Sequence, residues 1–101
     1  MSVNIDLTFT VTGLTGEAQT KAVAGAIEEL LRDERIDDQV SSRWTLKDGH
    51  FLVSGETDFS LSISRFYLWG PEFESSFEST VSGVAPEAKS VVTWGYPDHE
   101  F

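Results

Sequence analysis

The sequence predicts an α+β fold, a two-layer α/β sandwich in which two helices cover one face of a mainly antiparallel sheet. Three observations support this fold class. Apolar and polar residues alternate strictly from Val3 to Thr12, apolar residues recur at helical spacing in two separate stretches, and Asp48-Gly49 lies between two β-forming runs. A period of two is typical of a half-buried strand, and a period of 3.6 is typical of an amphipathic helix. We expect one domain over residues 1–101.

The first strand and the first helix follow from adjoining patterns. The strand at residues 3–12 has one apolar and one polar face, which indicates a sheet covered on one side only. Thr15 or Gly16 is the expected N-cap of a helix over residues 17–32. The acidic residues 33–38 lack periodicity and predict a solvated loop. The apolar stripe of the helix consists of Ala18, Ala22, Val23, Ala26, Ile27, Leu30 and Leu31.

A β-hairpin is predicted around Asp48 and Gly49. Both central positions of a two-residue type I′ turn need positive φ, which an Asp-Gly pair supplies. The turn joins strands at residues 40–47 and about 50–56. This register places four apolar side chains on one face that must be covered, namely Trp44, Leu46, Phe51 and Val53.

A third antiparallel strand is predicted after a turn at residues 55–58. Its apolar residues Phe59, Leu61 and Ile63 alternate with Ser60, Ser62 and Ser64, which are expected to be exposed. The run at residues 66–69 extends this strand toward Trp69 and is apolar on both faces. We expect that run to be buried on both sides or to contact another molecule.

A second helix is predicted to begin at Gly70 and Pro71, because proline suits the first helical position. Its narrow apolar stripe consists of Phe73, Phe77, Val81 and Val84. A last strand at about residues 89–96 and a polar tail at residues 97–101 follow. The element order is therefore β-α-β-β-β-α-β, and a ferredoxin-like plait with one added strand is a variant that has this order.

The composition is strongly acidic. Seventeen acidic residues outnumber seven basic residues, which gives a formal net charge of -10. This charge repels nucleic acid and anionic membranes and attracts basic partners, so direct nucleic-acid binding is not expected. Solubility, or a high-salt cytoplasm, would explain the acidity equally well. The lack of cysteine favours a reducing, cytoplasmic location, and we expect neither a targeting segment nor a membrane span.

The sequence contains no recognisable catalytic motif. It lacks a Gly-rich phosphate loop, a Gly-x-Ser-x-Gly elbow, a His-Glu-x-x-His helix and a cysteine pair. His50 and His99 have no partner at a metal-ligand spacing, and the tail around His99 is expected to be a frayed terminus. We therefore expect no enzyme activity, no catalytic residue, no cofactor and no metal.

Acidic and aromatic side chains form the candidate partner-binding site. Glu74 and Glu78 lie one helical turn apart, where like charges are slightly destabilising. No basic residue occurs from Phe66 to Ala88, so the second helix presents one sign of charge. Aromatic rings near strand ends are common in binding hot spots. A generally acidic surface and aromatic packing at the core are the simpler interpretations. The candidate residues are Glu72, Glu74, Glu78, Tyr67, Trp69, Trp94 and Tyr96.

These features favour a small, non-enzymatic interaction protein that binds and inhibits a basic, nucleic-acid-handling protein. Immunity proteins, antitoxins and phage-encoded inhibitors act in this general way, although no motif in the sequence identifies such a family. One alternative is a ligand-binding or catalytic domain that uses Arg43, His50 and Arg65 as anion contacts. Another is a structural subunit that self-assembles through its sheet edges or through residues 66–69. The sequence leaves the partner and the oligomeric state open.

Overall fold

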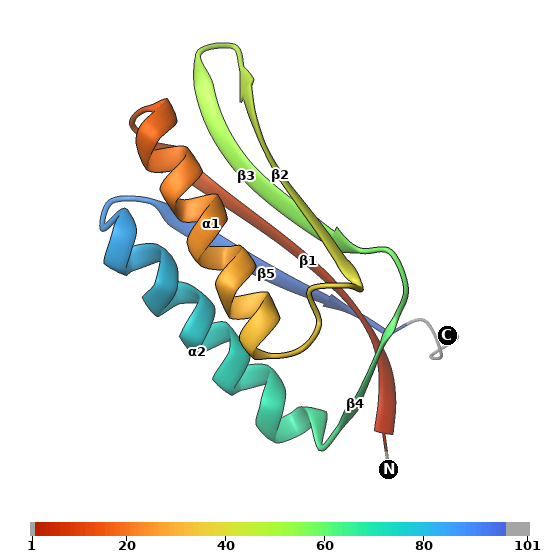
Figure 1. Cartoon of the computed structure of the whole chain (residues 1–101). Helices are drawn as coiled ribbons and strands as arrows, with labels where there is room; N and C mark the ends of the chain where they lie inside the picture. Colours follow the sequence, from red (N-terminus) through yellow and green to blue (C-terminus); the bar gives the residue numbers. More distant parts are fainter. Residues whose placement is uncertain (1, 97–101) are drawn as a thin grey trace.

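A computed structural model describes residues 2–96, so the predicted polar tail lies outside the described part. Its elements are β1 (Ser2–Leu14), α1 (Glu17–Asp33), β2 (Val40–Lys47), β3 (His50–Thr57), β4 (Leu61–Ser64), α2 (Phe66–Val84) and β5 (Lys89–Gly95). Both helices cover the same face of the sheet (Figure 1). The predicted two-layer α+β sandwich and its element order are therefore confirmed. Neither helix in this range is long and apolar enough to cross a membrane.

β1 is the central strand of the sheet. β3 pairs with its residues 8–14 and β5 with its residues 6–12, so these two strands lie on opposite sides of β1. β2 pairs with β3, which gives the order β2-β3-β1-β5 with every pair antiparallel. β4 pairs with residues 2–5, beyond the ends of both neighbours. This is a ferredoxin-like plait with β4 as the added strand.

The predicted hairpin forms in the predicted register. Trp44 lies opposite Val53 and Leu46 lies opposite Phe51, while Asp48 and Gly49 both have positive φ. The expectation that the whole apolar face is covered is wrong at the tip. Val53 is fully buried, but Leu46 is 58% exposed because the tip extends past the ends of the helices (Figure 1).

The core lies between the helices and the inner face of the sheet. It is built around three phenylalanines, Phe9 of β1 and Phe73 and Phe77 of α2, each at most 1% exposed. The ring of Phe9 lies 5.0 Å from that of Phe77 and covers Gly55 of β3, its partner across the strands. The largest fully buried aliphatic residues of the core are Ile5, Leu7, Val11, Val23, Ile27, Leu31, Val53, Leu61 and Val81.

α1 has the predicted extent but a narrower buried face. Its buried residues are Thr20, Val23, Ile27 and Leu31. Ala18 and Ala22 were expected in this stripe but are exposed, since they lie on the flank of the helix away from the sheet. Gly16 is the N-cap and has no side-chain cap. The Thr20 hydroxyl instead donates to the Gly16 carbonyl at 2.7 Å, which allows this polar residue to be buried.

α2 begins earlier than predicted. Residues 66–69 belong to the helix and not to the preceding strand, and Pro71 lies inside the helix. The N-cap Arg65 has a φ of 55°, which turns the chain sharply out of β4. Phe66 and Trp69 pack inward while Tyr67 and Leu68 are exposed, so the run that is apolar on both faces of a strand has one buried side in a helix.

Candidate functional site

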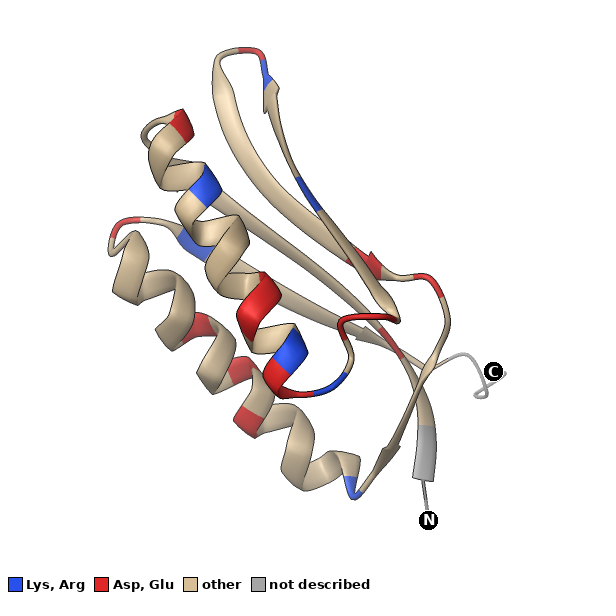
Figure 2. Cartoon of the chain, in the orientation of Figure 1, with Lys and Arg blue, Asp and Glu red and all other residues tan. Residues whose placement is uncertain are grey.

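The acidic charge is concentrated in the helical layer. Residues 17–39 and 66–88, which are the helices with the connections after them, carry eleven acidic and three basic residues. The other residues that the structure describes carry four of each sign. α2 contains Glu72, Glu74 and Glu78 and no lysine or arginine, and Figure 2 shows these acidic positions along the helix. The sheet therefore has almost no net charge, and the helical face is the source of the negative electrostatic field.

Two of the three candidate glutamates on α2 lie on the flank that faces β5. Glu78 borders an open hollow of about 420 Å³ together with Lys89 and Val91 of β5. Glu74 lies one turn before Glu78 on the same side of the helix. Glu72 lies on a different side, because two residues correspond to about 200° around a helix. The structure thus keeps Glu74 and Glu78 together and separates Glu72 from them.

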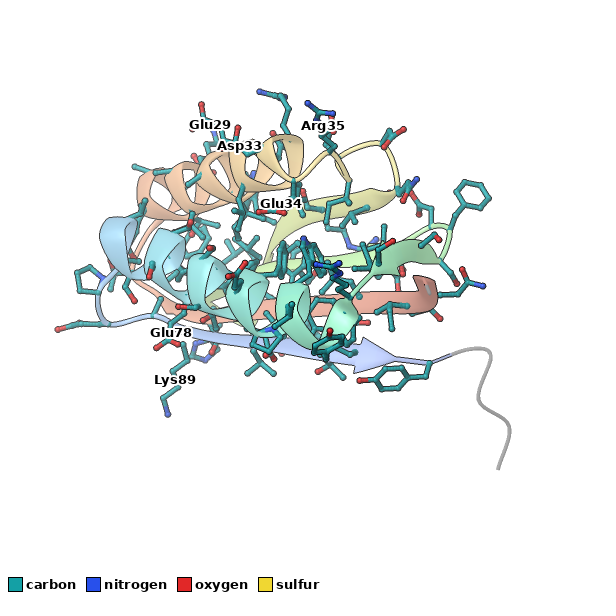
Figure 3. The ribbon with its side chains drawn as sticks, turned by 90° about the horizontal axis from the view of Figure 1, so that it is seen from below. Glu29, Asp33, Glu34, Arg35, Glu78 and Lys89 are labelled. Atoms are coloured by element: carbon teal, nitrogen blue, oxygen red, sulfur yellow. The ribbon has the colours of Figure 1, made fainter. Side chains whose placement is uncertain are left out.

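Lys89 is the basic residue next to this flank. Figure 3 shows Glu78 and Lys89 close to each other at the edge of the molecule. The side chain of Lys89 therefore offsets part of the negative charge at the C-terminal half of α2. Glu74 lies farther from Lys89 along the helix, so Lys89 offsets less of the negative charge of Glu74.

The four candidate aromatic residues divide into two inner and two outer rings. Trp69 stacks on Phe73 at 5.0 Å, and Trp94 packs edge-on against Phe66 at 4.9 Å and against Trp69 at 5.7 Å. Tyr67 is 75% exposed and Tyr96 is 47% exposed. Trp69 and Trp94 therefore belong to an aromatic cluster between α2 and β5. Tyr96 joins the rim of this cluster through an edge-on contact with Phe66 at 6.0 Å, while the Tyr67 ring is mostly exposed.

A hydrogen bond joins this cluster to α1. The Trp69 indole Nε1–H donates to Glu34 Oε2 at 2.9 Å, and Glu34 is the C-cap residue of α1. Figure 3 shows Glu34 between the helices, whereas Glu29 and Asp33 point outward. Trp69 therefore ties the first turn of α2 to the end of α1 and helps to fix the angle at which α2 crosses the sheet.

We expect Glu34→Ala to lower the free energy of unfolding by about 1–2 kcal/mol, because it leaves the partly buried indole N–H without its acceptor. Urea unfolding followed by tryptophan fluorescence measures this loss. Asp33→Ala removes the same charge from an exposed neighbour and should change stability by less than about 0.5 kcal/mol. Equal losses in the two variants would show that the effect is one of net charge and not of the hydrogen bond.

The suggested anion contacts do not converge. Arg43 and His50 lie on β2 and β3, on the sheet face away from the helices, whereas Arg65 caps α2. Arg43 borders a small hollow of about 180 Å³, lined also by Thr8, Thr10, Ser41, Ser54 and Glu56. No group of three or more His, Asp or Glu residues within the described range is arranged to hold a metal ion.

Sequence reasoning missed two residues of this region, Glu34 and Lys89. The acidic loop gave no sign that one of its carboxylates turns inward, because the indole partner lies 35 residues away in the chain. Lys89 was recognised only as the start of the last strand. The sequence does not show that β5 pairs with β1 or that α2 crosses above β5. Both facts are needed to place Lys89 beside Glu78.

Comparison with known proteins identifies the fold. No protein-family model and no curated protein matches the sequence. Among solved structures, the chain is similar to the de novo designed protein Foldit4, with a TM-score of 0.70 and 8% identity over 91% of this chain and 96% of that one. It is also similar to a dimeric ferredoxin-like protein from an uncultured marine organism, with a TM-score of 0.59 and 14% identity over 97% and 99% of the two chains. At these identities the likeness supports the ferredoxin-like α+β fold alone.

Proposed function

We propose that this protein is a non-enzymatic interaction protein that binds a basic protein through α2 and thereby inhibits it. The observation that carries this proposal is the separation of charge between the layers. A net charge spread evenly over the surface would serve solubility alone, whereas this charge is concentrated on the helices. Such a surface favours a partner whose own binding face is basic.

Binding would proceed in two steps. The field of the helical face first steers the basic partner toward α2, which raises the association rate. Tyr67 and Tyr96 then make apolar contact, because both rings are exposed at the end of the molecule where α2 begins and β5 ends. Trp69 and Trp94 pack against each other and hold α2 against β5, which fixes the positions of the two tyrosines.

The target class follows from charge complementarity. Proteins that handle nucleic acids carry basic grooves for phosphate groups. A protein with carboxylates on a rigid helix can occupy such a groove and exclude the nucleic acid.

The proposal predicts that reversing the charge of the α2 flank weakens capture of the partner. Tagged wild-type protein and Glu74→Lys/Glu78→Lys are incubated with lysate of the native host at moderate and at high salt, and the retained proteins are identified by mass spectrometry. We expect a basic protein to be retained at moderate salt and largely released at high salt. When the retained basic protein has been purified, the double variant should associate with it at least about tenfold more slowly than the wild-type protein does.

Glu28→Lys/Glu29→Lys is the matched control, since it makes the same change in net charge on α1. An equal effect of both double variants would show that only total charge matters and would remove α2 from the proposal. The retained protein is then assayed for nucleic-acid binding or cleavage with and without added wild-type protein. Unchanged activity at saturation would contradict the inhibitory function.

A further inference from the structure

The outer edge of β5 is an edge of the sheet that the described residues 2–96 form. β5 pairs only with β1 among the described strands, so its other side presents backbone N–H and C=O groups without a ladder partner. Natural proteins protect such edges with charged residues, proline or bulges. In β5 the only charged residue is Lys89, at its first position, while residues 90–95 contain no charged residue and no proline, and their register with β1 is regular. This edge is therefore open to pairing with another strand.

The opposite edge of the sheet, β2, is protected. Arg43 and Lys47 lie within β2, and the Lys21 ammonium of α1 lies 5.7 Å from the Trp44 ring centre. Arg43 and Lys47 would repel a basic segment and would interrupt a regular ladder, whereas Lys21 also pairs with Glu17 at 3.6 Å. β2 thus carries two cations within the strand and β5 carries one, at its first residue, so β5 is the less protected edge and the one that can accept a basic strand.

The α2 flank provides carboxylates at a spacing that suits a strand. Glu74 and Glu78 are four helical residues apart, which is a rise of about 6 Å along the helix. Alternate side chains of a β-strand on one face are about 6.8 Å apart. A strand added beside β5 would have one row of side chains on the helix side of the sheet, and this row would run below the flank of α2 that borders β5.

We propose that the β5 edge binds an extended basic segment of the partner as an additional strand, with its alternate lysine or arginine side chains directed at Glu74 and Glu78. The other row of that segment would lie beside Val91, which is 58% exposed on the far face of the sheet. This inference rests on the proposed function for the existence of a basic partner and adds the chemistry of its recognition. Backbone pairing supplies affinity, and the two carboxylates supply the preference for basic residues.

A second copy of this chain fits the same edge poorly. Two β5 strands paired around a two-fold axis would place both α2 helices on the same face of the joined sheet. The flanks that carry Glu74 and Glu78 would then face each other, and each copy has a formal net charge of -10. The repulsion between the two acidic flanks disfavours this dimer. The same glutamates would attract a basic strand.

The probe for this site is the peptide acetyl-Lys-Val-Lys-Val-Lys-Val-amide, which has basic residues on one face of a strand. Its affinity is measured by fluorescence anisotropy of a labelled copy, and amide hydrogen exchange of the protein is measured by NMR with and without saturating peptide. We expect exchange to slow at least tenfold at alternate amides of β5 and to remain unchanged in β2. The Glu74→Lys/Glu78→Lys variant should bind the peptide at least tenfold more weakly.

Val91→Lys tests the edge itself, because it adds a charged residue to the outer strand. We expect it to weaken peptide binding at least tenfold, while Thr45→Lys, the same charge change on β2, leaves the affinity within twofold. Peptide binding that depends on the glutamates without protection of β5 amides would overturn the edge and leave the proposed function standing. A Glu-Val peptide that binds as tightly as the Lys-Val peptide would contradict the basic partner as well. A peptide-free dimer with protected β5 amides would assign the edge to a second copy.

Discussion

Truncation of Phe77 to alanine is expected to lower the free energy of unfolding by about 3–5 kcal/mol. Its ring is fully buried and lies 5.0 Å from Phe9 of β1 and 6.1 Å from Phe73 of α2. It is therefore the side chain through which the middle of α2 is anchored to the central strand. Its removal leaves a cavity that the rigid sheet below cannot close, so the lost contacts are not replaced.

Urea denaturation of Phe77→Ala and of the exposed control Ser75→Ala measures this contribution. The control should differ from wild type by less than about 0.5 kcal/mol, because Ser75 lies on the solvent side of the same helix. Phe77 also lies between Glu74 and Glu78 in sequence, so the variant should weaken partner binding by releasing α2. A loss below 1 kcal/mol would mean that α2 is held by its aromatic first turn and not by this anchor.

The fold was largely predictable because its main signals are local. The alternation in β1, the Asp48-Gly49 turn and the helical stripes each depend on residues that are close in sequence. The hairpin register followed from the turn alone, since a two-residue loop leaves one pairing. Coverage of that hairpin was not predictable, because the exposure of Leu46 depends on where the helices end in space.

The start of α2 was predicted wrongly because a proline in a helix usually occupies the first position. Pro71 was assigned to the first helical position, but it lies five residues after Phe66, where it removes one helical hydrogen bond to the carbonyl of Tyr67. Tyr67 is exposed, so water can satisfy this carbonyl. The sequence did contain the better signal, because Phe66, Trp69 and Phe73 continue the apolar stripe at spacings of three and four.

The candidate site was predictable in composition and not in arrangement. The single sign of charge on the second helix is visible in the sequence, and so is the abundance of aromatic residues near it. Which glutamates share a flank, which rings are exposed and which strand edge is open depend on the pairing of β5 with β1 and on the start of α2. These are contacts between residues far apart in the chain, which no local pattern encodes.

Gly55→Ala is expected to destabilise the protein by about 3 kcal/mol although it adds a single methyl group. A Cβ atom at Gly55 would clash with Phe9 Cζ and would lie 2.9 Å from the backbone carbonyl oxygen of Ser41. The Phe9 ring cannot move away freely, because it packs against Phe77 in the core. Gly25→Ala is the control, since its Cβ meets nothing within 4 Å and alanine should stabilise α1 by about 1 kcal/mol.

A double-mutant cycle with Phe9→Leu separates the two contacts of the added methyl group. Leucine lacks the Cε2 and Cζ atoms that a Cβ at Gly55 would meet, so the combined loss in Gly55→Ala/Phe9→Leu should be at least about 1 kcal/mol smaller than the sum of the single losses. The contact with the Ser41 carbonyl persists in the double variant and accounts for the part that is not recovered. Strict additivity would show that this backbone contact, and not the ring of Phe9, requires glycine in β3.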